Sequence, residues 1–82
     1  MITSANADDQ IAAETLETIL RFGSAMLESG TTAYRAHRAM TLLAGKCGCA
    51  APAFAISHDS IAGALKFGAG RASLITKYGR EA

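Results

Sequence analysis

Two amphipathic helical patterns meet at one glycine in the stretch Leu27-Glu28-Ser29-Gly30-Thr31-Thr32-Ala33-Tyr34-Arg35. Gly30 stands where a helix commonly ends in a residue that tolerates a positive φ. Thr31 or Thr32 can then cap the start of a second helix with its hydroxyl oxygen. A connection this short predicts an antiparallel pair of helices that pack through their apolar stripes.

The helix before this glycine is expected over residues 8–29. Its apolar side chains recur at spacings of three to five, close to the helical period. They are Ile11, Leu16, Ile19, Leu20, Gly23, Met26 and Leu27. Acidic residues gather between Asp8 and Glu17, near the helix start, where the helix dipole favours negative charge. Residues 1–7 are interpreted as a flexible N-terminus, and residues 8–82 as a single small domain.

The helix after the glycine is expected over residues 32–47. One face is apolar and small, with His37 among its members; the others are Ala33, Ala36, Met40, Leu43, Ala44 and Cys47. The basic residues Arg35, Arg38 and Lys46 fall mainly on the opposite face. This arrangement predicts that one side packs on the first helix while the basic side faces solvent.

After Gly48 the period of the pattern changes from helical to alternating. Large apolar residues alternate with small or polar ones in two runs that contain Phe54-Ala55-Ile56-Ser57 and Ile61 to Phe67, and Ala72 to Tyr78 forms a third run. His58-Asp59 and Gly68-Ala69-Gly70 read as the connecting turns.

The expected fold is therefore α+β, an antiparallel helical hairpin packed on a three-stranded antiparallel β-meander over about residues 53–78. The predicted core consists of Ile19, Leu20, Met26, Leu27, Met40, Leu43, Phe54, Ile56, Ile61 and Leu65.

Composition limits the size of this core. The chain has 82 residues, half of them hydrophobic, but with three Phe, two Tyr and no Trp it has few large side chains. Small domains of this kind are often only marginally stable alone, and a partner surface would supply what the core lacks. The charge is uneven: five acidic and one basic residue precede Ser29, whereas seven basic and two acidic residues follow from there. The later part is therefore the better candidate for meeting anions or an anionic membrane surface.

Metal binding and catalysis are the first two functional hypotheses to weigh. Cys47-Gly48-Cys49 is a single close pair, with His37 and His58 elsewhere, whereas zinc sites usually repeat such a pair. Two reduced cysteines and no bound metal or cofactor are expected. His58-Asp59 lies next to serines, but neighbours on a tight turn point apart, so we expect no catalytic residue and no enzyme activity.

Nucleic-acid binding is an alternative from another class. The helix–glycine–helix unit with Arg35 and Arg38 is similar to a helix-turn-helix reader of DNA. The net charge of +1 and the strands that follow in place of a third helix weigh against it, so no nucleic-acid partner is expected. A free-standing protein-interaction domain is the remaining alternative.

A family resemblance extends from Leu20 to Lys77. Its pieces, in chain order, are Gly23, Leu27, Ser29-Gly30, Tyr34-Arg35, Leu43, Gly48, Phe54-Ala55-Ile56-Ser57 and Ser60-Ile61. This order resembles the soluble N-terminal domain of the threonine/serine exporter family, membrane transporters of bacteria and fungi that include dicarboxylate exporters. The weight of this resemblance comes from the order and spacing of the whole stretch.

The resemblance implies a soluble accessory or regulatory module at the cytoplasmic face of a membrane, and a cytoplasmic protein otherwise. Family members continue into a bundle of transmembrane helices that this sequence lacks, so the chain is expected to be a fragment or split subunit unable to transport alone. Its expected partner is that transmembrane domain or a second copy of the chain. Tyr34, Arg35 and Arg38 are the expected ligand or partner contacts, and Gly30 is the structural turn.

Overall fold

The computed structural model describes residues 4–79 and begins with two helices. Helix α1 spans Ser4–Glu28 and helix α2 spans Ala33–Lys46. The predicted start of the first helix at residue 8 is wrong, because the helix already includes residues 4–7, which had been interpreted as flexible. Residues 1–3 lie outside the described part of the chain. The alanines before Asp8 favour helix, so Asp8 and Asp9 lie inside the helix and not at its predicted start.

The turn between the helices has the geometry expected at Gly30. Its φ is +101°, in the left-handed region. The N–H of Gly30 donates to the carbonyl of Leu27 at 3.1 Å, and the N–H of Thr31 donates to the carbonyl of Met26 at 3.0 Å. These two bonds form a Schellman motif, which satisfies the last carbonyls of α1. The hydroxyl of Thr32 then accepts from the N–H of Arg35 at 3.3 Å and caps the start of α2.

Replacing Gly30 with alanine is expected to lower the free energy of unfolding by about 1 kcal/mol. A Cβ at this position meets no atom within 4 Å, so the whole cost comes from holding an L-residue at positive φ. Urea unfolding followed by circular dichroism measures it. Gly45→Ala in α2 is the matched control, since its Cβ also enters open space while its φ is ordinary, and it should be neutral or stabilising. Equal effects of the two changes would contradict the assigned role of Gly30.

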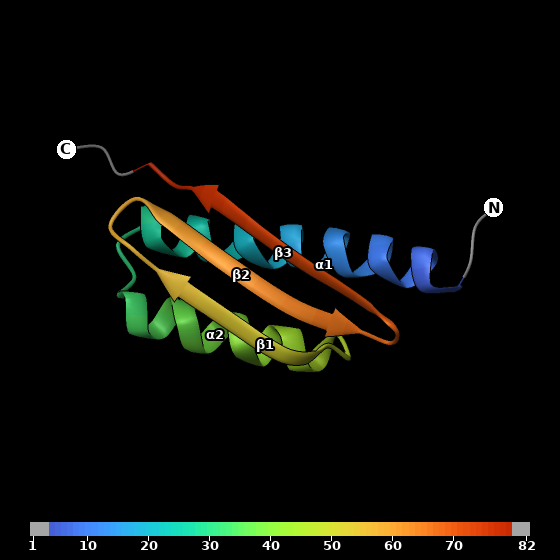
Figure 1. The fold of residues 1–82 in the computed structure, drawn as a ribbon. Coiled ribbons are helices and arrows are strands. Elements are labelled where there is room, and N and C mark those ends of the chain that lie inside the picture. Colours follow the sequence, from blue (N-terminus) through green and yellow to red (C-terminus); the bar gives the residue numbers. More distant parts are fainter. Residues whose placement is uncertain (1–3, 80–82) are drawn as a thin grey trace.

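Three antiparallel strands follow the helices in the spatial order β1-β2-β3. Strand β1 spans Ala50–Ile56, β2 spans Ser60–Phe67 and β3 spans Gly70–Lys77. Figure 1 shows both helices behind the same face of this sheet, with α2 along β1 and α1 nearer to β3. The α+β fold with a helical hairpin and a β-meander is thus confirmed, and within residues 4–79 the other face of the sheet carries no helix.

The strand connections are tight, as the sequence predicts, but the first strand is longer than expected. Phe67 pairs with Gly70 across a turn in which Gly68 has a φ of +58°. Strand β1 begins at Ala50 instead of residue 53, and its register shifts between Ala50 and Ala53. Ala51 has a φ of +52° at this bulge, so the residues before the predicted strand form an irregular first part of β1.

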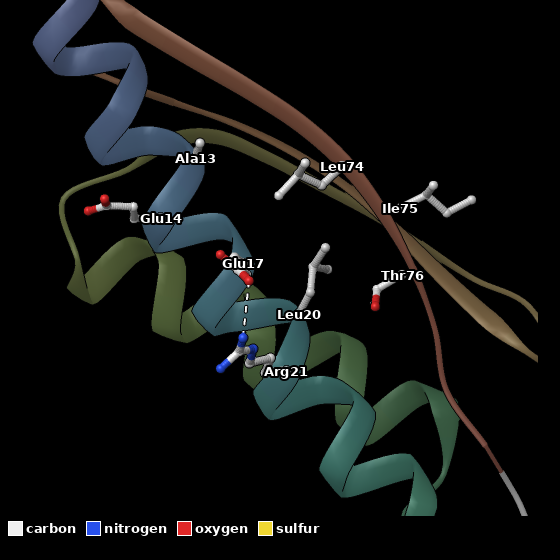
Figure 2. A pocket seen from close by; sticks show the side chains of 8 residues that line it. All are labelled: Ala13, Glu14, Glu17, Leu20, Arg21, Leu74, Ile75 and Thr76. Atoms are coloured by element: carbon white, nitrogen blue, oxygen red, sulfur yellow. Dashed lines mark hydrogen bonds and ion pairs between the residues drawn. The ribbon is translucent and has the colours of Figure 1, made fainter.

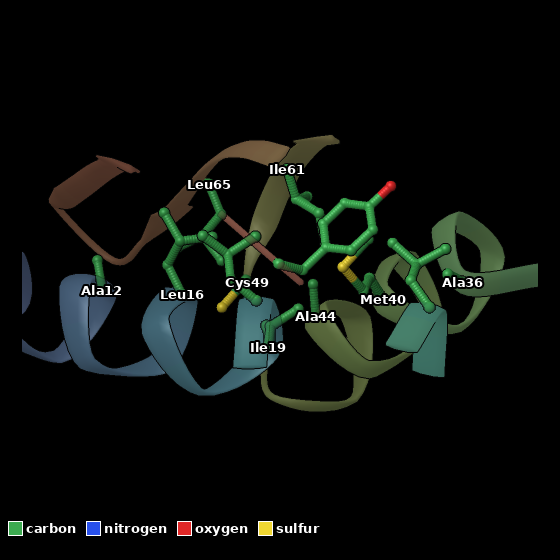
Figure 3. Packing of buried hydrophobic residues seen from close by; sticks show 12 residues of the cluster. Ala12, Leu16, Ile19, Ala36, Met40, Ala44, Cys49, Ile61 and Leu65 are labelled. Atoms are coloured by element: carbon green, nitrogen blue, oxygen red, sulfur yellow. The ribbon is translucent and has the colours of Figure 1, made fainter. Parts of the chain in front are cut away.

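The core lies between the helical hairpin and the inner face of the sheet (Figure 3). Of the ten predicted core residues, the six that are fully buried are Ile19, Leu20, Leu27, Met40, Ile61 and Leu65. The other four, Met26, Leu43, Phe54 and Ile56, are half-buried and pack against them. The buried members that the prediction omitted are Ala12, Leu16, Ala36, Ala44, Cys49 and Tyr78.

Small residues let the two helices approach each other closely. Ala36 and Ala44 of α2 are completely buried, and a Cβ added at Gly23 of α1 would lie 3.1 Å from Cγ of Met40. Met40 is itself fully buried and fills the space beside Gly23. The alanine-rich composition therefore gives close helix packing, which partly makes up for the scarcity of aromatic side chains.

Asp8 and Asp9 join the start of α1 to the β2–β3 hairpin. A carboxylate oxygen of Asp8 accepts from the N–H of Ala69 at 2.9 Å, and one of Asp9 accepts from the N–H of Arg71 at 3.0 Å. The expectation that these carboxylates sit at the helix N-terminus is wrong, because the first turn of α1 contains no acidic residue. They satisfy backbone donors of a segment more than sixty residues away instead.

Candidate functional site

A hollow of about 490 Å³ lies at the end of the molecule where the α1–α2 turn meets the β1–β2 turn. It is bounded by small, polar and apolar residues from both turns and from the end of the sheet. They are Leu27, Gly30, Thr31, Thr32, Ala33, Ile56, Ser57, His58 and Tyr78. The start of α2 forms part of its wall, and the N-terminus of a helix carries partial positive charge.

A hydrogen-bond network holds the sheet side of this hollow in place. The hydroxyl of Tyr78 donates to the carbonyl of Ser57, and the N–H of Tyr78 donates to the carbonyl of Asp59 at 3.0 Å. The hydroxyls of Ser57 and Ser60 lie 2.9 Å apart, and the hydroxyl of Ser57 also donates to the carboxylate of Asp59 at 3.3 Å. The hydroxyl of Ser57 and the carbonyls of Ser57 and Asp59 therefore all have partners within the turn or in Tyr78.

His58 faces solvent and is not aligned with a serine. Its side chain is 92% exposed, and its Nε2 lies 3.9 Å from a carboxylate oxygen of Asp59. Within residues 4–79 no hydrogen bond joins His58 to the hydroxyl of Ser57 or Ser60. A serine nucleophile needs a hydrogen-bonded base that a third group orients. The turn therefore has the geometry of a structural connection.

The three expected contact residues lie together on the outside of α2. Tyr34, in the first turn of this helix, is 72% exposed, and Arg35 and Arg38 are also exposed. Tyr34 and Arg38 are four residues apart and share one helix face. None of the three lines the hollow, whose wall includes their neighbour Ala33. The structure thus places them beside the hollow, on the adjoining surface.

The two cysteines differ in their surroundings. Both are free; Cys47 is exposed, whereas Cys49 is buried. Burial raises the pKa of the Cys49 thiol, and the negative charge of a Cys47 thiolate raises it further. In the part of the chain that the structure describes, no three histidine, cysteine or acidic side chains come together as metal ligands would.

This difference predicts selective modification of the thiols. Iodoacetamide at neutral pH should react with Cys47 about ten times faster than with Cys49, or more, because the reactive species is an accessible thiolate. A raised pKa leaves less thiolate at Cys49, and burial hinders access to it. Labelling rates of Cys47→Ser, which retains Cys49, and of Cys49→Ser measure the two sites separately. Equal rates in the folded proteins would contradict the burial of Cys49, whereas equal rates in urea are expected.

A second hollow, a groove of about 530 Å³, runs between α1 and β3. Its lining consists of Ala13, Glu14, Glu17, Leu20 and Arg21 from α1, and of Leu74, Ile75 and Thr76 from β3. Figure 2 shows Leu20 and Leu74 within this groove, while Ile75 points to the other side of the strand. Arg21 and Glu17 form an exposed ion pair of 3.1 Å on the helix wall.

Sequence reasoning did not identify this groove. Leu74 and Ile75 both lie in the third predicted strand, Ala72 to Tyr78, but adjacent residues of a strand face opposite ways. Leu74 is 38% exposed and Ile75 is 70% exposed. The alternation that was applied to the first two strands, extended to Ala72 and Leu74, would have placed Ile75 on the uncovered face.

Two further observations bear on function. Neither helix, over the residues described, is long and apolar enough to cross a membrane. In comparisons with known proteins, the chain matches no family model, no curated protein and no solved structure.

Proposed function

We propose that this chain is a non-catalytic accessory module of a threonine/serine exporter, or of a related exporter of small dicarboxylates, and that it binds the exporter's transmembrane domain. The observation that carries the proposal is the ordered resemblance from Leu20 to Lys77. The module would act at the cytoplasmic face of the membrane, by regulating or assembling the transporter. The solute itself would be bound in the membrane helices, where transporters hold their substrates.

The positions of the matched residues in the fold support this proposal. Ser29-Gly30 ends α1, and Gly48, with a φ of +81°, lies between α2 and β1. Ser57 and Ser60 form the β1–β2 turn, where the N–H of Ser57 donates to the carbonyl of Ser60 at 2.9 Å. The resemblance thus consists largely of residues that end or connect elements, and their spacing reflects the lengths of helices and strands. If this chain has the same fold as the exporter's N-terminal domain, residues of this kind should occur in the same order in both.

The surface of α2 supports a partner-binding role. An exposed tyrosine beside two exposed arginines has the composition that protein interfaces favour, because these side chains combine apolar area with hydrogen-bond donors. The same arginines would also be attracted to the anionic inner surface of a membrane. Tyr34, Arg35 and Arg38 are therefore the residues through which we propose that the module contacts the transporter.

Co-expression with the transmembrane domain of a threonine/serine exporter tests the proposal. The chain should co-purify with that domain in detergent, and Tyr34→Ala with Arg35→Ala should weaken the complex about thirtyfold. The matched control is Leu42→Ala together with Lys46→Ala, which removes one apolar and one basic side chain from exposed positions elsewhere on α2. Threonine efflux from cells provides the functional readout.

Two results would contradict the proposal. In the first, the chain binds neither the transmembrane domain nor vesicles that contain anionic lipid. In the second, it binds duplex DNA with an affinity that falls steeply with salt, the behaviour of a protein that neutralises phosphates. That second result would favour the nucleic-acid alternative, and the first would leave a free-standing interaction domain.

A further inference from the structure

The outer edge of β3 carries backbone groups that face away from the sheet. The N–H of Tyr78 donates to the carbonyl of Asp59, so Tyr78 faces β2. In an antiparallel ladder every second residue faces the same neighbour, and the residues between them face outward. Ser73, Ile75 and Lys77 are therefore outward-facing, and β3 is a terminal strand of the sheet.

The contact of Arg71 agrees with this alternation. Arg71 shares the parity of Ile75, and its N–H donates outward, to the carboxylate of Asp9 in α1. Asp9 thus covers the first outward N–H of β3. Among the hydrogen bonds within residues 4–79, the outward N–H groups from Ser73 to Lys77 have no such cover.

The opposite edge of the sheet is protected. Strand β1 contains Pro52, which has no N–H, and the bulge at Ala51 interrupts its register. Proline and bulges are common means by which proteins prevent pairing at an edge strand. The two edges of this sheet therefore differ, and only β3 offers a regular outward ladder.

Apolar side chains lie next to the middle of the β3 edge, and charged side chains lie on the neighbouring surface of α1. Ile75 is the most exposed large aliphatic side chain among the described residues, at 70%. The groove beside it has Leu20 and Leu74 in its interior and Glu14, Glu17 and Arg21 on the α1 wall (Figure 2). A strand laid against β3 would cover both the ladder and this apolar centre.

We propose that the partner at this edge is a second copy of the chain, paired antiparallel through β3 about a two-fold axis at Ile75. The pairing joins two three-stranded sheets into one of six strands. Ile75 then lies opposite Ile75 of the second copy, and Ser73 lies opposite Lys77 of the second copy. The outward N–H and C=O groups of these residues complete the ladder from both sides.

Charge favours this register over the one with the two-fold axis at Leu74. A two-fold axis at Leu74 would place Arg71 opposite Lys77 of the second copy, and like charges directly opposite each other are destabilising. It would also compete with the bond between Arg71 and Asp9. With the axis at Ile75, the lysine faces a serine. Arg71 then falls opposite Gly79 of the second copy, which lies beyond the end of β3, so the Asp9 contact is retained.

The α1 wall of the groove is complementary to itself under the same axis. Its acidic residues, Glu14 and Glu17, precede its basic residue, Arg21. A two-fold axis reverses the chain direction, so the acidic part of one helix faces the basic part of the other. This self-complementarity is what an interface between identical copies requires, and it favours a second copy over an unrelated strand.

Sedimentation equilibrium of the purified chain, from micromolar to millimolar concentration, tests the proposal. The chain should form dimers, and Ile75→Lys should raise the dissociation constant about thirtyfold or more by placing two ammonium groups at the axis. The matched control, Leu42→Lys, makes the same change at a 58% exposed position of α2 and should leave the dimer intact. Circular dichroism checks that both variants fold.

Cross-linking tests the register independently. Ile75→Cys in a Cys47→Ser background should form an intermolecular disulfide under mild oxidation, because opposite residues of a strand pair lie within disulfide range. Leu42→Cys in the same background should not. A chain that stays monomeric throughout, or a folded Ile75→Lys that dimerises as well as Leu42→Lys, would overturn the proposal. Neither result depends on exporter binding, so the two proposals are tested separately.

Discussion

Gly70→Ala is expected to destabilise the protein by about 3 kcal/mol, because the added methyl group overlaps backbone atoms that cannot move independently. A Cβ at Gly70 would lie 2.6 Å from the carbonyl oxygen of Asp8, with the neighbouring backbone of Asp8 and Asp9 closer still. Relief requires the start of α1 to move away from the hairpin. That movement also breaks the bonds from Ala69 and Arg71 to the two carboxylates.

Thermal unfolding at one fixed protein concentration measures this effect. The melting temperature of Gly70→Ala should fall by more than about 10 °C, given the size of the domain. Gly45→Ala again serves as the control, because its Cβ meets nothing within 4 Å. A Gly70→Ala protein that melts with the wild type would show that α1 does not pack against the hairpin as described.

Leu16→Ala should cost about 3 kcal/mol, the usual range for a buried leucine whose removal leaves a cavity. Leu16 is fully buried, and one of its methyl groups would lie 3.0 Å from a Cβ built on Gly63 of β2. It therefore fills the space that this glycine leaves beneath the centre of the sheet.

Urea unfolding is the appropriate measurement for this variant. The midpoint should fall without a change in the slope m, because the variant alters stability and not the surface exposed on unfolding. Leu42→Ala removes the same atoms from a 58% exposed site on α2, so its effect should stay within about 0.5 kcal/mol. If Leu16→Ala and Leu42→Ala behave alike, the assigned core is wrong.

Most of the fold follows from local patterns in the sequence. Gly30 and the threonines after it predict the turn, because a positive φ and a hydroxyl cap are properties of individual residues. The change from helical to alternating periodicity after Gly48 predicts the strands, because this pattern too is formed by residues close together in the chain. The α+β fold, the two strand connections and six fully buried members of the core are thus determined by residues near one another in the chain.

The features that the sequence did not reveal depend on distant residues. The sequence around Asp8 and Asp9 predicts a helix start. Their role as acceptors for the β2–β3 hairpin could not be predicted, because that hairpin lies more than sixty residues further along the chain. Leu16 belonged to the helical stripe, but only the glycine opposite it in β2 makes it central to the core. Likewise, the spacing of Tyr34, Arg35 and Arg38 is enough to place them on the outer face of α2. The hollow beside them could not be predicted, because it forms only where the α1–α2 turn and the β1–β2 turn come together.

The edge of β3 depends both on local sequence and on distant parts of the structure. Side chains alternate between the two faces of a strand, so the sequence of residues 72–78 is enough to predict which of them share a face. Whether a strand is central or terminal depends on the order of the sheet, and whether its edge is covered depends on where α1 lies. Backbone N–H and C=O groups are the same in every residue type except proline, so side-chain patterns specify the strands but do not indicate which sheet edge is open. The β3 edge stays open because of the order of the strands and the position of α1.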